Sequence, residues 1–101
     1  MAHTNRKSNI LEKLIKDEWA ILRDLRKVMN NPDLSLDEKI RAANAFGYHA
    51  SVLSKLIAQK GQETQLNETT LGEFITGVEP RIARHVLVGF KHWMKTLSRK
   101  R

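Results

Sequence analysis

The residues of this chain best suited to chemistry are the cations near its C-terminal end. Seven Lys or Arg fall between Pro80 and Arg101, and no Asp or Glu accompanies them. The rest of the chain carries eleven Lys or Arg against eleven Asp or Glu, so the net charge of +7 is confined to this end. Such a local excess of positive charge favours electrostatic binding of a polyanion.

Helical spacing places most of these cations on one side of a predicted helix that begins at Pro80. An apolar arc of about 140° contains Ile82, Ala83, Val86, Leu87, Phe90, Trp93, Met94 and Leu97. Cations near the C-terminus of a helix offset its dipole, but Arg81 and Arg84 lie at the N-terminal end, where cations are disfavoured. Phosphate contact explains that placement, so we predict a nucleic-acid ligand, with DNA favoured over RNA. The predicted contact residues are Arg81, Arg84, His85, Lys91, His92, Lys95, Arg99, Lys100 and Arg101.

No residue pattern indicates an enzyme. The chain has no Cys, no glycine-rich phosphate loop and no nucleophile elbow. His85 and His92 are seven residues apart, which is too far for the usual i, i+4 metal pair. We therefore predict no catalytic residue, no metal site and no cofactor.

Four helices must position these residues, so the predicted fold is all-α. It is a small helical bundle with a long antiparallel helical hairpin, a short helix and a basic C-terminal helix. Ser8 or Asn9 is expected to cap a first helix ending near Met29, before a turn at residues 30–33. The other expected helices run from a capping box at Ser35 to about Lys60, from Glu68 to Thr76, and onward from Pro80.

The second helix carries two contact faces. One is Leu36, Ile40, Ala43, Gly47, Ala50, Ser54 and Ile57, whose small centre allows close approach of a neighbouring helix backbone. A helix with two such faces lies either inside its own bundle or between the bundle and a second copy. The second face contains Ala42 and the four residues of the predicted oligomer interface, for a homodimer or other homo-oligomer: Ala45, His49, Val52 and Leu56.

Three side chains leave alternatives open. Glu18 interrupts the apolar stripe of the first helix, so it either reaches solvent through a bend in the stripe or pairs with His49, Tyr48 or Asn44 on the facing helix. Trp93 is expected in the core because it falls in the apolar arc. Trp19 and Tyr48 lie to the side of their stripes, where either packing or ligand contact fits.

Size and composition favour a single intracellular domain. The chain has 101 residues, of which 41% are hydrophobic and 29% are charged. We expect a flexible arm over residues 1–9, one helical domain over residues 10–101, no membrane span and a cytoplasmic location.

The segment from Thr70 to Val86 resembles a helix-turn-helix motif. The resemblance is carried by the Gly77-Val78 turn, by Glu79-Pro80, and by the basic residues that follow. It implies DNA binding over residues 68–99, with Arg81, Arg84 and His85 reading bases and with Lys91 and Lys95 meeting phosphates. Glu73 and Thr76 depart from the family, which has a small residue and a leucine there.

The alternative function is a non-enzymatic interaction module. In that hypothesis the helical hairpin of residues 10–60 is the interface for oligomerisation or for another protein. The basic tail then docks an acidic protein partner.

Overall fold

The computed structural model describes residues 2–61 and 66–98, which form four helices and, in that part of the chain, no strand. They are α1 (Ala2–Met29), α2 (Leu36–Lys60), α3 (Glu68–Phe74) and α4 (Pro80–Ser98). The all-α bundle predicted from the sequence is therefore confirmed.

The capping residues predicted from the sequence make the expected hydrogen bonds at most helix ends. The Ser35 side chain accepts a hydrogen bond from the Glu38 amide, and the Glu38 carboxylate accepts one from the Ser35 amide, which completes a capping box at the start of α2. Gly61 ends that helix with a φ of 83°. Asn67 and Thr70 form an equivalent box before α3.

Two helix bounds differ from the predicted ones. The first helix begins at Ala2, and not at Ser8 or Asn9, because nothing in residues 2–8 breaks a helix even though they are polar. The flexibility of residues 1–9 stays a prediction. The short α3 ends at Phe74, two residues before Thr76, where the Ile75 amide donates to the Leu71 and Glu73 carbonyls. Gly77, with a φ of 97°, then redirects the chain toward α4.

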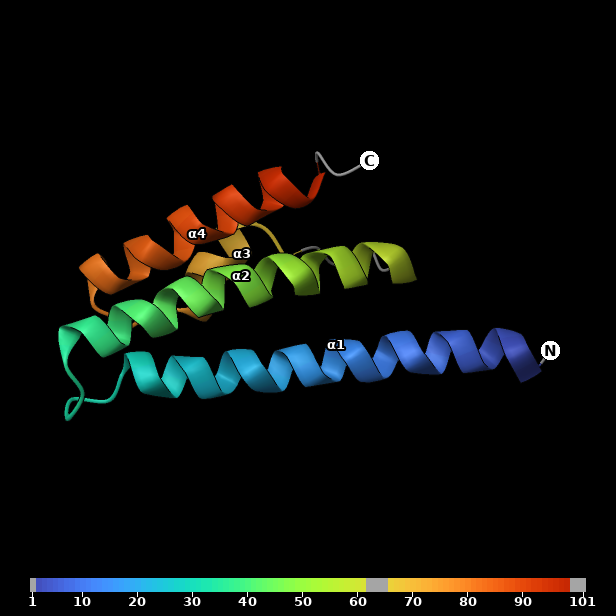
Figure 1. Ribbon diagram of the computed structural model, residues 1–101, viewed down its shortest axis with the longest axis horizontal. Helices are drawn as coiled ribbons and strands as arrows, with labels where there is room; N and C mark the ends of the chain where they lie inside the picture. Colours follow the sequence, from blue (N-terminus) through green and yellow to red (C-terminus); the bar gives the residue numbers. More distant parts are fainter. Residues whose placement is uncertain (1, 62–65, 99–101) are drawn as a thin grey trace.

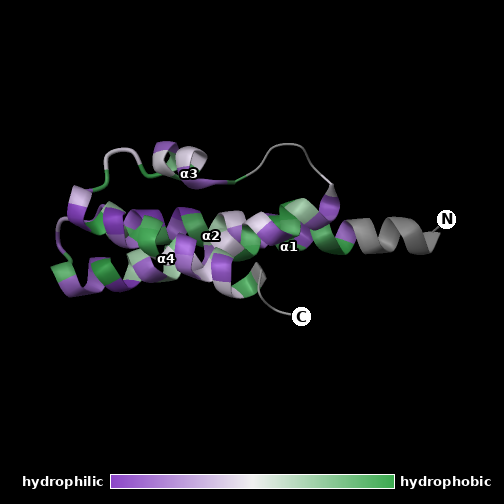
Figure 2. Ribbon diagram, turned by 90° about the horizontal axis from the view of Figure 1, so that it is seen from above, coloured by the Kyte–Doolittle hydropathy of each residue, from purple (hydrophilic) through white to green (hydrophobic). Residues whose placement is uncertain are grey.

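The three long helices form a layer with α2 in the middle. Figure 1 shows α1 antiparallel to α2 on one side, and α4 parallel to α2 on the other. Because α2 and α4 point the same way, the chain between them must return along the layer. Figure 2 shows that the described part of this connection, residues 66–79 with α3, covers one face of the layer. We call the opposite face the open face.

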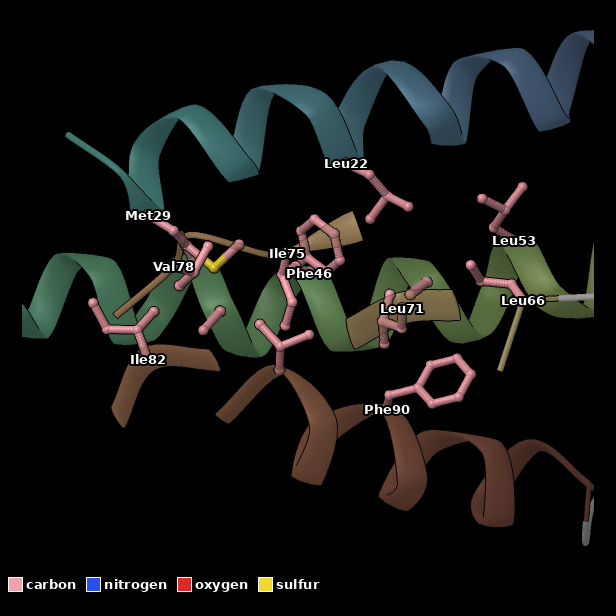
Figure 3. Packing of buried hydrophobic residues seen from close by; sticks show 14 of the residues in the cluster. Leu22, Met29, Phe46, Leu53, Leu66, Leu71, Ile75, Val78, Ile82 and Phe90 are labelled. Atoms are coloured by element: carbon pink, nitrogen blue, oxygen red, sulfur yellow. The ribbon is translucent and has the colours of Figure 1, made fainter. Parts of the chain in front are cut away.

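The core lies between the layer and α3. Figure 3 shows Phe46 of α2, Leu71 of α3 and Phe90 of α4 pointing into this space, together with Leu22 of α1. The ring of Phe74 joins the helices, since it lies 5.6 Å from the Trp19 ring and 5.7 Å from the Phe46 ring. Trp19 is thus a packing residue.

The close approach expected at the small centre of α2 is confirmed, and the neighbour is α4. A Cβ built at Gly47 would lie 2.8 Å from both the Phe90 nitrogen and the Val86 oxygen. The two helix backbones are therefore in direct contact at Gly47, next to Gly89 of α4. This contact fixes the position of α4, and with it the basic residues.

Candidate nucleic-acid interface

The outward side of α4 forms a basic edge of the molecule. Arg81, Arg84, Lys91 and Lys95 are all exposed, and we call these four residues the basic ridge. They are held outward because Ile82, Val86 and Phe90 of the same helix are buried on its other side. Helix α4 itself contains no Asp or Glu, so this edge has no acidic residue of its own.

Two carboxylates from outside α4 reach the basic ridge. Glu79 lies 3.1 Å from the Arg81 guanidinium, and Glu68 lies 3.8 Å from the Lys91 ammonium. Both pairs are on the surface, where ion pairs contribute little and exchange readily with other anions. Arg84 and Lys95 have no ion-pair partner among the described residues. Two of the four ridge cations are therefore unpaired within the described part of the chain, and the other two are in weak surface pairs.

The remaining predicted contact residues have different surroundings. His85 is half-buried between α4 and α2, and His92 is exposed with its ring 5.1 Å from the Trp93 ring. Arg99, Lys100 and Arg101 lie outside the described residues. As nucleic-acid contacts, all nine residues stay predictions.

The helix-turn-helix prediction concerns α3 and α4, which are both present with Gly77 between them. Arg81 and Arg84 are exposed at the start of α4, as base-reading residues would need to be. His85 instead packs beside α2. DNA reading by this segment stays a prediction.

The sequence did not predict the groove that runs between the first turns of α2 and α4. It has a volume of about 340 Å³, and its lining combines apolar and basic side chains: Leu36, Ile40, Arg81, Arg84, His85 and Val88. We call it the apolar groove. Leu36 is 43% exposed and Val88 is 60% exposed. The sequence places Leu36 and Ile40 on a contact face of α2, but only the tertiary arrangement shows that α4 leaves them partly uncovered.

Glu18 has a partner in α2. Its carboxylate lies 2.9 Å from Nδ1 of His49, and the Glu18 side chain is only 17% exposed. Of the two alternatives left open, the structure shows the polar contact between facing helices. The solvent-exposed alternative is wrong, because the Glu18 side chain is mostly buried at the contact of α1 with α2.

The predicted oligomer interface is partly occupied within the chain. Ala45, His49, Val52 and Leu56 are all half-buried, His49 pairs with Glu18, and Leu56 packs against the core. Its role in oligomerisation stays a prediction.

Trp93 is not a core residue, contrary to expectation. It is half-buried, and its ring contacts are with Tyr48, at 5.0 Å, and His92. The reason is its neighbour on α2: Trp93 packs against Tyr48, which is itself 38% exposed, so this contact does not enclose the ring.

A second cluster of cations lies at the end of α1. Arg23, Arg26, Lys27 and Asn30 line a shallow pocket there, and the Arg26 guanidinium lies 5.5 Å from the centre of the Phe74 ring. The C-terminal end of a helix favours cations, and this accounts for their placement.

Other kinds of site find no support in the described part of the chain. No group of three or more His, Asp or Glu side chains there is placed to hold a metal ion. No described helix is long and apolar enough to cross a membrane. Comparison with protein families, curated proteins and solved structures finds no match to this chain.

Proposed function

We propose that the protein binds nucleic acid by contacting phosphates through the basic ridge of α4. The observation that carries the proposal is the exposed, single-sign charge of that ridge, with Arg84 and Lys95 unpaired among the described residues. Most solvent-facing helices mix charges of both signs, and such mixing is enough for solubility. A helix that has four exposed cations and no Asp or Glu of its own is better explained by an anionic ligand.

The length of the ridge suits several phosphates. Arg84 and Lys95 are separated by about 16 Å along the helix axis at 1.5 Å per residue. One strand of a duplex places a phosphate about every 3.4 Å along its axis, so this distance spans about five phosphates. Cations at two or more turns of α4 therefore meet phosphates of the same strand at once.

The test replaces Arg84, Lys91 and Lys95 together with Gln, which keeps a polar side chain of good helix propensity but removes the charge. Binding to duplex and single-stranded oligonucleotides of equal length should be lost, while the helical content stays unchanged. The matched control replaces Lys16, Arg23 and Lys27, three exposed cations of α1, and lowers the net charge equally. Equal loss in both variants would show that overall charge acts, and not the ridge. Retained affinity in the α4 variant would refute the proposal.

The apolar groove supports a second candidate function, the docking of an acidic protein segment. Exposed Leu36 and Val88 beside Arg81 and Arg84 suit an amphipathic helix with leucines on one side and glutamates on the other. Phosphate contact gives no role to these two apolar side chains.

Loss of the apolar side chains of the groove tests the second candidate function without changing the first. Replacing Leu36 and Val88 with Ala keeps every charge, so nucleic-acid binding should remain within about twofold. Binding of a designed acidic amphipathic peptide should fall at least tenfold, since two apolar contacts of roughly 1 kcal/mol each are lost. If the wild-type protein does not bind the peptide, the second candidate is excluded.

A further inference from the structure

Four aromatic rings form a continuous row on the open face. The ring of His49 lies 5.3 Å from that of Tyr48, Tyr48 lies 5.0 Å from Trp93, and Trp93 lies 5.1 Å from His92. We call these residues the aromatic row. It crosses from the contact of α1 with α2 to the outer side of α4.

The aromatic row lies away from α3. Phe46 contacts Phe74 of α3, and Tyr48 follows two residues later, about 200° around the helix. The ring of Tyr48 therefore points to the face that α3 does not cover. Tyr48 is 38% exposed, His92 is exposed and Trp93 is half-buried. Single exposed apolar residues are common, but adjacent rings on one surface indicate a contact site.

Positive charge flanks the row on both helices. On α2, Arg41 precedes Tyr48 by seven residues, which places both on the same side of the helix, and Asp37 lies one turn before Arg41. On α4, Lys95 of the basic ridge follows His92 by three residues, less than one helical turn. The carboxylate nearest the row, Glu18, is already paired with His49. A ligand in which flat groups alternate with negative charges matches this surface, because the flat groups meet the rings and the charges meet the cations.

We propose that the aromatic row stacks unpaired nucleobases, so that the protein binds single-stranded nucleic acid in preference to duplex. This inference rests on the proposed function, because the basic ridge supplies the phosphate contacts. The faces of the bases in a duplex are covered by their neighbours, and only an unpaired strand presents them to Tyr48, Trp93 and His92. Stacking is tolerant of sequence, since every base has a flat π face. Both DNA and RNA single strands are therefore ligands.

The decisive experiment uses the wild-type protein and three ligands of equal length and charge per strand. These are a thymidine oligonucleotide, its abasic counterpart and a duplex. The thymidine oligonucleotide should bind about 5- to 160-fold more tightly than the abasic strand, which corresponds to stacking of one base. Binding of the thymidine and abasic strands with equal affinity would overturn the inference while leaving the proposed function intact. Absence of binding to all three ligands would overturn both.

Replacement of Tyr48 tests the row itself. Tyr48→Leu should reduce the thymidine-to-abasic affinity ratio toward one, and Tyr48→Phe should restore most of it. The matched control is Leu14→Ala, which removes a comparably exposed apolar side chain from α1 and should keep the wild-type ratio. An unchanged ratio in Tyr48→Leu would contradict a role for the row. If Tyr48→Leu does not fold, His92→Ala at an exposed position gives the same comparison.

Fluorescence gives an independent signal. In a Trp19→Phe protein, Trp93 is the only tryptophan, and stacked thymidine should quench its emission. The abasic strand should not quench it. Equal quenching by both strands would show an indirect effect and would contradict direct stacking at Trp93.

Discussion

Single side chains decide how closely the helices of this protein pack. Gly47 has the tightest surroundings, because a methyl group there meets the backbone of α4, which cannot rotate away as a side chain can. Gly89 faces the same contact, but a Cβ built there is 3.8 Å from its nearest neighbours. The backbone contact therefore requires a glycine at position 47 but not at position 89.

Gly47→Ala should destabilise the protein by about 1–3 kcal/mol, because α2 and α4 must separate to admit the methyl group. Gly89→Ala should be neutral or stabilising by up to about 1 kcal/mol, since alanine favours the helix and its Cβ fits. Urea denaturation of both variants measures the difference. Similar midpoints for the two would contradict the backbone contact.

The pair between Glu18 and His49 is the other decisive residue-scale contact. Glu18→Ala should lower the free energy of unfolding by about 1–3 kcal/mol, because it leaves His49 without its partner in a half-buried position. Glu18→Gln should cost less, because an amide still hydrogen-bonds to the ring. The comparison is made by denaturant unfolding at neutral pH. Equal losses in both variants would show that the amide cannot replace the carboxylate, and would contradict this expectation.

At the scale of elements, an ion pair joins the end of α2 to α1. Lys60, at the end of α2, lies 2.6 Å from the Glu12 carboxylate of α1. The hydrogen bond and the positive charge of Lys60 hold the pKa of Glu12 below its ordinary value of 4.5. A lowered pKa in the folded state means that the pair stabilises above that ordinary value, and that the stabilisation is lost as pH falls through the folded-state pKa.

Glu12→Gln should therefore lower the urea midpoint at neutral pH but not at low pH. Below the folded-state pKa the wild-type carboxyl is protonated and resembles the amide, so the two proteins should converge there. Midpoints measured at a series of pH values from about 7 down to about 3 test this. A constant difference over the whole series would contradict the linkage.

Gly77 sets the direction of α4 relative to α3. Its φ of 97° favours glycine, so Gly77→Ala should cost about 1–2 kcal/mol, and Gly77→Asn should cost less. Gly72→Ala is the control, because it lies within α3 with open space around it. Thermal unfolding ranks the three variants. A ranking in which Gly72→Ala is the most destabilising would contradict this view of the turn.

At the scale of the whole molecule, most helix ends and the antiparallel pair of long helices were predictable, but the neighbours of α4 were not. Helix ends are set by local hydrogen bonds and dihedral angles, and these signals can be read in the sequence. They lie at Ser35, Gly61, Asn67 and Pro80. The exposed side of α4 follows from spacing alone. The half-buried position of Trp93 does not follow from spacing, because an apolar arc predicts that a side chain packs but not which neighbour it packs against.

The same limit applies to the surfaces. The apolar groove joins Leu36 to Val88, and the aromatic row joins Tyr48 to Trp93, across more than forty residues of sequence. Both require α2 and α4 to lie side by side and parallel, which depends on the path of the chain through α3. Because α3 covers only one face of the layer, the apolar groove and the aromatic row stay accessible beside the basic ridge.

The central claim is that phosphates meet the cations of α4, and the salt dependence of binding tests it most directly. For a wild-type protein that contacts five to seven phosphates, the affinity for duplex DNA should fall with a log–log slope of about −4.5 to −6. Replacement of Arg84, Lys91 and Lys95 with Gln should reduce the magnitude of that slope by about 2.7, at 0.9 per phosphate contact. A slope unchanged by the three substitutions, or a wild-type affinity independent of salt, would contradict the claim.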